Sequence, residues 1–209
     1  MVVSDVIRKR SKVTVKFDND DEIIIPYDVY LKKYLSKNDI VTKKELKELE
    51  QEIEIYLIKQ SSFRYLSGRN HSKKELELKL FKKNYNRSLV NSVINDLERQ
   101  NLVNDENFAE EFFIAQQKRK RGLLKIKAEL FKKGINREII DFVSSKHHED
   151  SIFWESAKLV AAKKYISLKK RNIESRKIKE KMYRFLSGRG FSPEIVQETI
   201  KGLEINTYE

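Results

Sequence analysis

Basic side chains are the residues of this sequence whose types and spacing could do chemistry, and that chemistry is the binding of phosphate groups. Two triplets recur fifty positions apart: Lys82, Lys83 and Arg87, and then Lys132, Lys133 and Arg137. Two further groups are denser: Lys118, Arg119, Lys120 and Arg121, and then Lys169, Lys170 and Arg171. Cations that neutralise phosphates release counterions, so repeated cations favour a polyanionic partner. A solvated helix face is the simpler interpretation of any single lysine, so this prediction depends on the repetition.

Candidates for catalysis or metal binding are weaker. His71 lies in a predicted turn, and His147-His148 adjoin a predicted joint between helices, without the H-E-x-x-H spacing of a zinc site. We expect all three histidines to be exposed and solvated. Acidic pairs such as Asp105-Glu106 are typical of the first turn of a helix, and nothing selects an acid–base pair among the carboxylates. We therefore predict that the protein is not an enzyme and holds no cofactor or metal ion.

The recurring cations surround a corner that occurs three times. Residues 80–87 and 130–137 are nearly the same, and 186–193 is a looser third copy. Each copy has one residue suited to the left-handed backbone that ends a helix, namely Asn84, Gly134 or Gly190. Repetition of this kind is typical of a fold built from stacked units.

Helix caps follow the stops at a constant distance. Two residues after each stop comes a residue that can cap the next helix: Asn86, Asn136 and Ser192. Between stop and cap lies an apolar residue that can pack on the fourth helical position as a hydrophobic staple. The three pairs are Tyr85 with Val90, Ile135 with Ile140, and Phe191 with Val196. Each corner is therefore predicted to be a helix–turn–helix.

The overall charge agrees with the basic groups. The sequence has 44 Lys and Arg against 32 Asp and Glu, a net charge of +12 and a pI near 9.6. Nucleic acid, or a complex that contains it, is the expected partner, and a merely solubilising surface is the alternative. No apolar run approaches the roughly 18 residues of a membrane span, and residues 1–5 lack the apolar region of a secretory signal. With no cysteine, we expect a cytoplasmic protein without membrane contact.

Residues 1–30 differ from the rest, and from about residue 42 the pattern is helical. Residues 13–17 alternate in the manner of a strand. Polar residues join them to a second predicted strand at 22–25, which gives a β-hairpin ended by Pro26. An isolated hairpin is marginally stable, so we expect it to pack on a neighbour or to gain a strand. Thr42 and Glu45 form a capping box that opens a helix extending to Leu57. A separate helix is expected to follow and to end near Gly68.

The remaining apolar periodicity predicts an all-α protein of three tandem three-helix repeats in an elongated curved array, preceded by the small hairpin. The predicted parts are an extension at 1–57 and repeats at 58–102, 103–149 and 150–209. Ser72 and either Asn104 or Asp105 are expected helix caps, and Gly122 is an expected break. Residues 144–150 are a possible joint. Arg176-Lys177 is expected between helices of the third repeat, and the protein is expected to be a monomer.

Three segments resemble, in their order and spacing, the RecX family of recombinase regulators. They are Arg69-x-x-Ser72-x-x-Glu75-Leu76-x-x-x-Leu80, Asn104-Asp105-x-x-Phe108-Ala109 and Glu129-Leu130-x-x-Lys133-Gly134-Ile135. The resemblance covers about residues 60–205, and the hairpin resembles an extension found in some members. Two departures are Lys120-Arg121-Gly122, where the family often has Gly-Tyr-Gly, and Asn84 in place of glycine.

The resemblance implies a partner and an activity that composition alone does not. The partner is the RecA recombinase assembled on single-stranded DNA. The implied activity is binding in the groove of that filament, with inhibition of strand exchange, ATP hydrolysis and co-protease activity, and often filament disassembly. A basic, repetitive helical array is compatible with a long groove of acidic protein and phosphate.

Two alternatives stay open. One is a helix–turn–helix protein that binds duplex DNA, for which Glu138 and Glu194 in the first turns after the corners are unfavourable beside phosphate. The other is a scaffold that binds protein only, whose affinity would depend little on salt. The basic groups named above are the candidate contact residues both for a recombinase regulator and for a duplex-binding protein.

Overall fold

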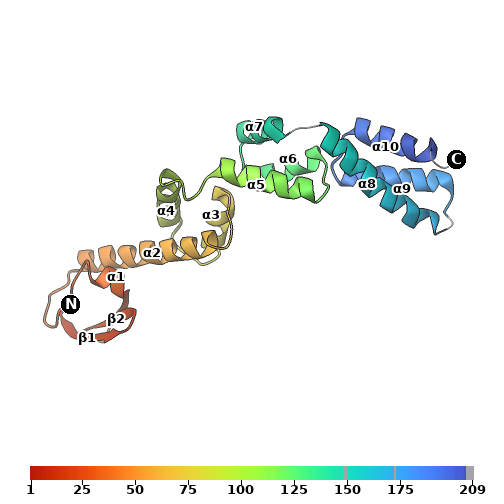
Figure 1. Cartoon of the computed structure of the whole chain (residues 1–209). Helices are drawn as coiled ribbons and strands as arrows, with labels where there is room; N and C mark the ends of the chain where they lie inside the picture. The colour runs from red at the N-terminus through yellow and green to blue at the C-terminus, as the bar shows by residue number, and fades with distance from the viewer. Residues whose placement is uncertain (148–149, 172, 206–209) are drawn as a thin grey trace. The chain divides into compact units, whose positions relative to one another are not determined.

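The computed structural model describes residues 1–147, 150–171 and 173–205. The chain divides into two compact units, Met1–Val103 and Asn104–Glu209 (Figure 1). Among the helices of the described residues, none combines the length and the apolar content needed to cross a membrane.

The first unit begins with a three-stranded antiparallel sheet in the order β1-β2-β3. Its strands are β1 (Val3–Lys9), β2 (Lys12–Phe17) and β3 (Glu22–Pro26). The predicted hairpin is β2 with β3, and Val13 lies opposite Ile25. The hairpin gains β1 as its third strand, as its marginal stability required. The sequence did not indicate β1 because Val3 is its one buried residue, so the strand lacks an alternating pattern.

A single long helix connects the sheet to the first repeat. After the short α1 (Tyr27–Tyr30), helix α2 runs from Lys43 to Leu66. The capping box at Thr42 and Glu45 is confirmed. The prediction of two helices in this stretch was wrong, because nothing between residues 57 and 63 stops a helix. Leu49 packs under the sheet and Ile58 packs in the first repeat, so the boundary placed after residue 57 falls inside α2.

Three tandem three-helix repeats are confirmed. The first consists of the end of α2 with α3 (Lys73–Phe81) and α4 (Arg87–Arg99). The second consists of α5 (Asp105–Lys118), α6 (Leu123–Lys132) and α7 (Arg137–His147). The third consists of α8 (Asp150–Lys169), α9 (Ser175–Gly188) and α10 (Pro193–Ile205). Ser72 and Asn104 cap α3 and α5 as predicted.

The three corners have the predicted backbone. Asn84, Gly134 and Gly190 are left-handed, with φ of 60°, 87° and 86°. The caps are also confirmed, because Asn86 Oδ1 accepts from Ser88 N at 2.9 Å and Asn136 Oδ1 accepts from Ile139 N at 2.9 Å. The third cap is longer, since Ser192 Oγ accepts from Ile195 N at 3.3 Å. Each staple pair lies within one apolar cluster of its repeat.

The second and third repeats share one apolar core. Phe113 of α5 and Phe153 of α8 meet edge to face, with ring centroids 6.4 Å apart. Gly122 lies at the break between helices α5 and α6, as predicted, and it also lies against Gly190 and Phe191 of the third repeat. The possible joint at residues 144–150 lies partly outside the described residues, so it stays a prediction.

The expectation of exposed histidines was wrong. His71 is only 3% exposed, and its Nδ1 lies 3.0 Å from the Arg69 carbonyl oxygen in the turn between α2 and α3. His147 is half-buried, with Nε2 3.0 Å from Glu110 Oε1. His71 is buried because its ring packs against the ring of Tyr65, with the ring centroids 6.1 Å apart. Sequence spacing does not reveal this contact. His148 lies outside the described residues.

Candidate functional site

The first corner presents three exposed cations, of which Lys83 also contacts two side chains of α2. Lys82 caps the C-terminus of α3 and Arg87 opens α4, and both are exposed. The Arg87 guanidinium lies 5.3 Å from the Phe81 ring centre. Lys83 Nζ donates to Ser61 Oγ at 3.1 Å and lies 5.7 Å from the Tyr65 ring centre. Because the Lys83 ammonium already contacts Ser61 and Tyr65, Lys82 and Arg87 are better placed than Lys83 to meet a partner.

The second corner repeats this division. Lys132 ends α6 and Arg137 opens α7, and both are exposed. Lys133 is half-buried, and its ammonium lies 5.1 Å and 5.7 Å from the ring centres of Phe112 and Phe108. A cation over an aromatic ring at the C-terminus of a helix stabilises the fold.

The third repeat uses the same position in the same way. Arg189 aligns with Lys83 and Lys133, and its guanidinium lies 5.1 Å from the Phe185 ring centre. Packing on an aromatic ring is thus common to all three repeats at this position. Sequence reasoning missed this structural role because the partners of Lys83 and Lys133 come from other helices, α2 and α5.

The dense group at residues 118–121 also divides. Lys118 and Arg119 are exposed at the end of α5. Lys120 is left-handed, with φ of 57°, and Arg121 is half-buried in an ion pair with Glu129. Since a partner would have to compete with Glu129 for Arg121, Lys118 and Arg119 are the more accessible cations.

The last predicted group lies at the C-terminal end of α8 and just beyond it. Lys169 ends that helix with its ammonium 5.2 Å from the Tyr165 ring centre, and Lys170 and Arg171 are exposed beyond it. Lys82, Lys83 and Arg87 belong to the first compact unit, and the other predicted cations belong to the second.

A groove between α9 and α10 is the part of the site that sequence reasoning missed. Its volume is about 480 Å³. Arg176 and its neighbour Lys177 lie in α9, so the expectation that they lie between helices was wrong. Helix α9 contributes Arg176, Lys179, Glu180, Tyr183 and Arg184 to the lining, and α10 contributes Gln197, Ile200 and Lys201.

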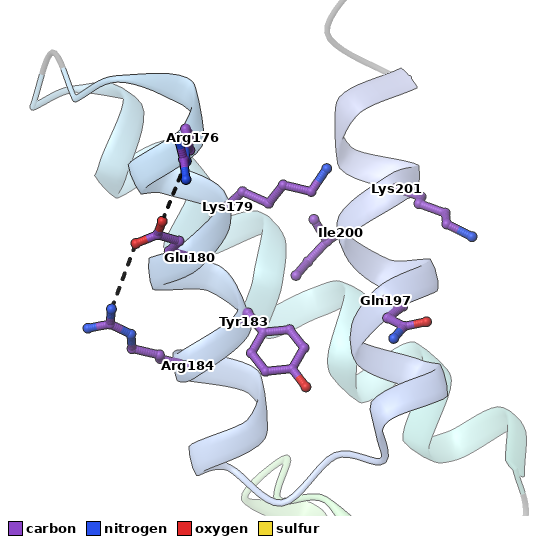
Figure 2. Close-up of a pocket in the computed structure, with 8 residues that line it drawn as sticks. All are labelled: Arg176, Lys179, Glu180, Tyr183, Arg184, Gln197, Ile200 and Lys201. Atoms are coloured by element: carbon purple, nitrogen blue, oxygen red, sulfur yellow. Dashed lines mark ion pairs between the residues drawn. The ribbon is translucent and has the colours of Figure 1, made fainter.

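Figure 2 shows that Tyr183 and Lys179 point into the space between α9 and α10. Lys179 and Tyr183 are four residues apart on α9, beside the buried stripe of Ile178 and Met182, so the spacing places them on one face but does not show that α10 lies opposite. Among the described residues, no group of three or more His, Asp or Glu side chains is placed to hold a metal ion.

Comparison with known proteins assigns the family. Models of the first, second and third three-helix domains of RecX match residues 59–97, 104–143 and 150–200. A regulatory protein RecX of Clostridium perfringens is 30% identical over 210 residues, covering 99% of this chain and 98% of the relative. The chain belongs to the RecX family. A RecX protein of Clostridium acetobutylicum is also 30% identical, over 93% of this chain and 91% of the relative.

Solved RecX structures share the fold. The crystal structure of a regulatory protein RecX aligns with a TM-score of 0.71 at 20% identity, covering 96% of this chain and 98% of that one. The crystal structure of RecX from Lactobacillus salivarius aligns with a TM-score of 0.61 at 26% identity, covering 73% of this chain and 97% of that one. The three-helix repeats are thus shared with solved RecX proteins.

Proposed function

We propose that this RecX-family chain is a negative modulator of the RecA recombinase. It binds, as a monomer, in the groove of the filament that RecA forms on single-stranded DNA, and it inhibits strand exchange, ATP hydrolysis and co-protease activity. Because that filament forms in the cytoplasm, the proposal places the chain there. The residues in contact with the filament are the exposed members of the predicted basic groups.

The observation that carries the proposal is the exposed cation pair at matching corners of a RecX-family chain. Lys82 with Arg87, and Lys132 with Arg137, flank the same turn in two repeats. Cations repeated at one structural position can meet a filament whose phosphates and acidic groups also repeat. The neighbouring Lys83 and Lys133 instead contact aromatic rings of their own repeats.

The experiment is a titration of RecA ATPase on single-stranded DNA with this chain, at two salt concentrations. Inhibition is expected to weaken at higher salt because counterion release contributes to binding. The variant Lys132→Glu with Arg137→Glu is expected to raise the half-inhibiting concentration at least about tenfold, since reversed charges repel the same partner. Lys133 is left unchanged because it packs on Phe108 and Phe112.

The matched control is Lys158→Glu with Lys163→Glu, which reverses two exposed lysines on α8 outside the predicted groups. It is expected to inhibit like the original protein. Equal loss in both double variants would show that only net charge matters. No inhibition by the unaltered chain, together with a defined footprint on duplex DNA, would favour the duplex-binding alternative instead.

A further inference from the structure

We propose that the groove between α9 and α10 binds single-stranded nucleic acid, with one base stacked on Tyr183 and an adjacent phosphate beside Lys179. The proposal concerns the third repeat, and none of the predicted corner cations lines this groove. It stands independently of RecA, because it predicts binding to a free oligonucleotide.

The groove has the size and the lining for such a ligand. Its volume of about 480 Å³ lies within the range of small-ligand sites. The Tyr183 side chain is 45% exposed, so a ligand in the groove can reach its ring. Figure 2 shows its ring between the two helices, with Ile200 on the opposite helix. An aromatic face beside an aliphatic wall suits a flat base, whatever its identity.

The charge of the groove suits a phosphate. Four cations line it, namely Arg176, Lys179, Arg184 and Lys201, against the single carboxylate of Glu180. Arg176 Nε and Arg184 Nη2 lie 3.9 Å and 3.7 Å from the two oxygens of Glu180. The arginines therefore compensate Glu180 on one flank of α9, while the Lys179 side chain extends toward α10 (Figure 2).

Gln197 completes the set of groups that a nucleotide requires. Its carboxamide, on α10, has two N–H donors and an acceptor oxygen, so it can pair with the polar edge of different bases. Gln197 is exposed, so this pairing requires no buried polar group to lose its partner. The site is expected to tolerate different sequences, because stacking and phosphate contact do not select a base.

The lining favours a single strand over the other polyanions. In a duplex the faces of the bases are stacked on each other, so Tyr183 could not stack on a base. An acidic peptide could pair with Lys179 but would gain nothing specific from an aromatic face. A cation, an aromatic ring and an amide line the same groove, and this combination indicates that the ligand is an unpaired nucleotide.

The test is fluorescence anisotropy of a labelled oligothymidylate titrated with the full chain, without recombinase. Tyr183→Ala is expected to weaken binding about 5- to 100-fold, and Tyr183→Phe is expected to keep most of it, because the aromatic face remains. Lys179→Gln is expected to lower the slope of log affinity against log salt by about 0.7, the value for one phosphate of a single strand. Lys181→Gln is the matched control, since Lys181 is exposed on the same helix but does not line the groove.

Competition identifies the ligand class. Unlabelled single strand is expected to displace the label at lower concentration than a duplex of equal length. Tighter binding of the duplex, equal displacement by polyglutamate, or unchanged affinity of a folded Tyr183→Ala protein would each overturn the proposal. Circular dichroism shows whether each variant is folded. If the chain binds the oligonucleotide as predicted but does not inhibit RecA, only the proposed function fails. If the chain inhibits RecA but does not bind the oligonucleotide through this groove, only the groove proposal fails.

Discussion

Gly122 donates its backbone N–H to the carbonyl oxygen of Arg189 at 2.9 Å, which joins the second repeat to the third through the main chain. Leu124 N–H adds a second bond, to the Gly190 carbonyl oxygen at 3.0 Å. The backbones can approach this closely because neither Gly122 nor Gly190 has a Cβ atom. A Cβ built on Gly122 would lie 2.1 Å from the carbonyl carbon of Gly190. Together with their shared core, this contact makes the two repeats one body.

Gly122→Ala is therefore expected to destabilise the protein. The added methyl group meets backbone rather than a flexible side chain, so the repeats must separate, at a cost of roughly 1–3 kcal/mol or more in the free energy of unfolding. Urea unfolding measures the loss. Gly188→Ala is the matched control, because a Cβ there meets no atom within 4 Å. Gly188 is helical, so that variant should gain up to about 1 kcal/mol. Equal stability of the two variants would contradict the close contact.

Lys120→Gly is expected to stabilise the second repeat. Lys120 has φ of 57°, a left-handed conformation that costs a non-glycine residue roughly 1–2 kcal/mol. Glycine removes that cost but loses more conformational entropy on folding, so a net gain of about 0.5–1 kcal/mol is expected from thermal unfolding. Lys120→Ala removes the same charge and keeps the Cβ atom, so it should give no such gain. If alanine stabilised as much as glycine, charge rather than backbone strain would be responsible.

The local rules of helix ends made much of the fold predictable. Stops, caps and staples depend on residues within about five positions of each other, so Asn84, Gly134 and Gly190 could be assigned from spacing alone. The continuity of α2 was missed because helix-end signals mark where a helix stops, and no comparable signal shows that a helix continues. Strand β1 was missed because its pairing with β2, rather than its own pattern, makes it a strand.

The site was less predictable because its geometry depends on contacts between helices. Nothing in the spacing shows that Gly122 meets Gly190, or that Lys133 lies over Phe112. The groove was missed for the same reason, since Tyr183 and Ile200 face one cavity only after α9 and α10 pack. Basic residues could thus be counted from the sequence, but their division between packing and binding could not.

His71 is expected to make stability depend on pH. Burial lowers the pKa of its imidazole from the ordinary 6.5, and the positive charges of Arg69 and Lys79 also lower it. The hydrogen bond to the Arg69 carbonyl and the negative charge of Glu75 raise the pKa, but they do not cancel the effect of burial. That carbonyl accepts from Nδ1–H, so neutral His71 keeps a lone pair on Nε2, which has no hydrogen-bond partner in the described residues. Protonation would place a charge in this turn.

Because the folded state binds the proton less readily than the unfolded state, stability rises with pH across this window. The free energy of unfolding should fall as the pH drops below 6.5, by a fraction of the roughly 1.4 kcal/mol per pH unit that one proton can contribute. Urea unfolding between pH 7.5 and 5.5 measures the slope, and His71→Phe should flatten it. An unchanged slope in that variant would assign the dependence to another group.

Lys132 and Lys133 are adjacent in the sequence but are expected to respond differently to the same substitution. Lys133→Gln removes the ammonium over Phe108 and Phe112, so it should lower the free energy of unfolding by about 0.5–1 kcal/mol. Lys132→Gln removes an exposed charge, so it should leave stability within about 0.5 kcal/mol and weaken filament inhibition instead. Urea unfolding and RecA ATPase, measured on both variants, separate the two roles. If Lys132→Gln destabilised the protein more than Lys133→Gln, the division of each corner into a packing cation and a binding cation would be wrong.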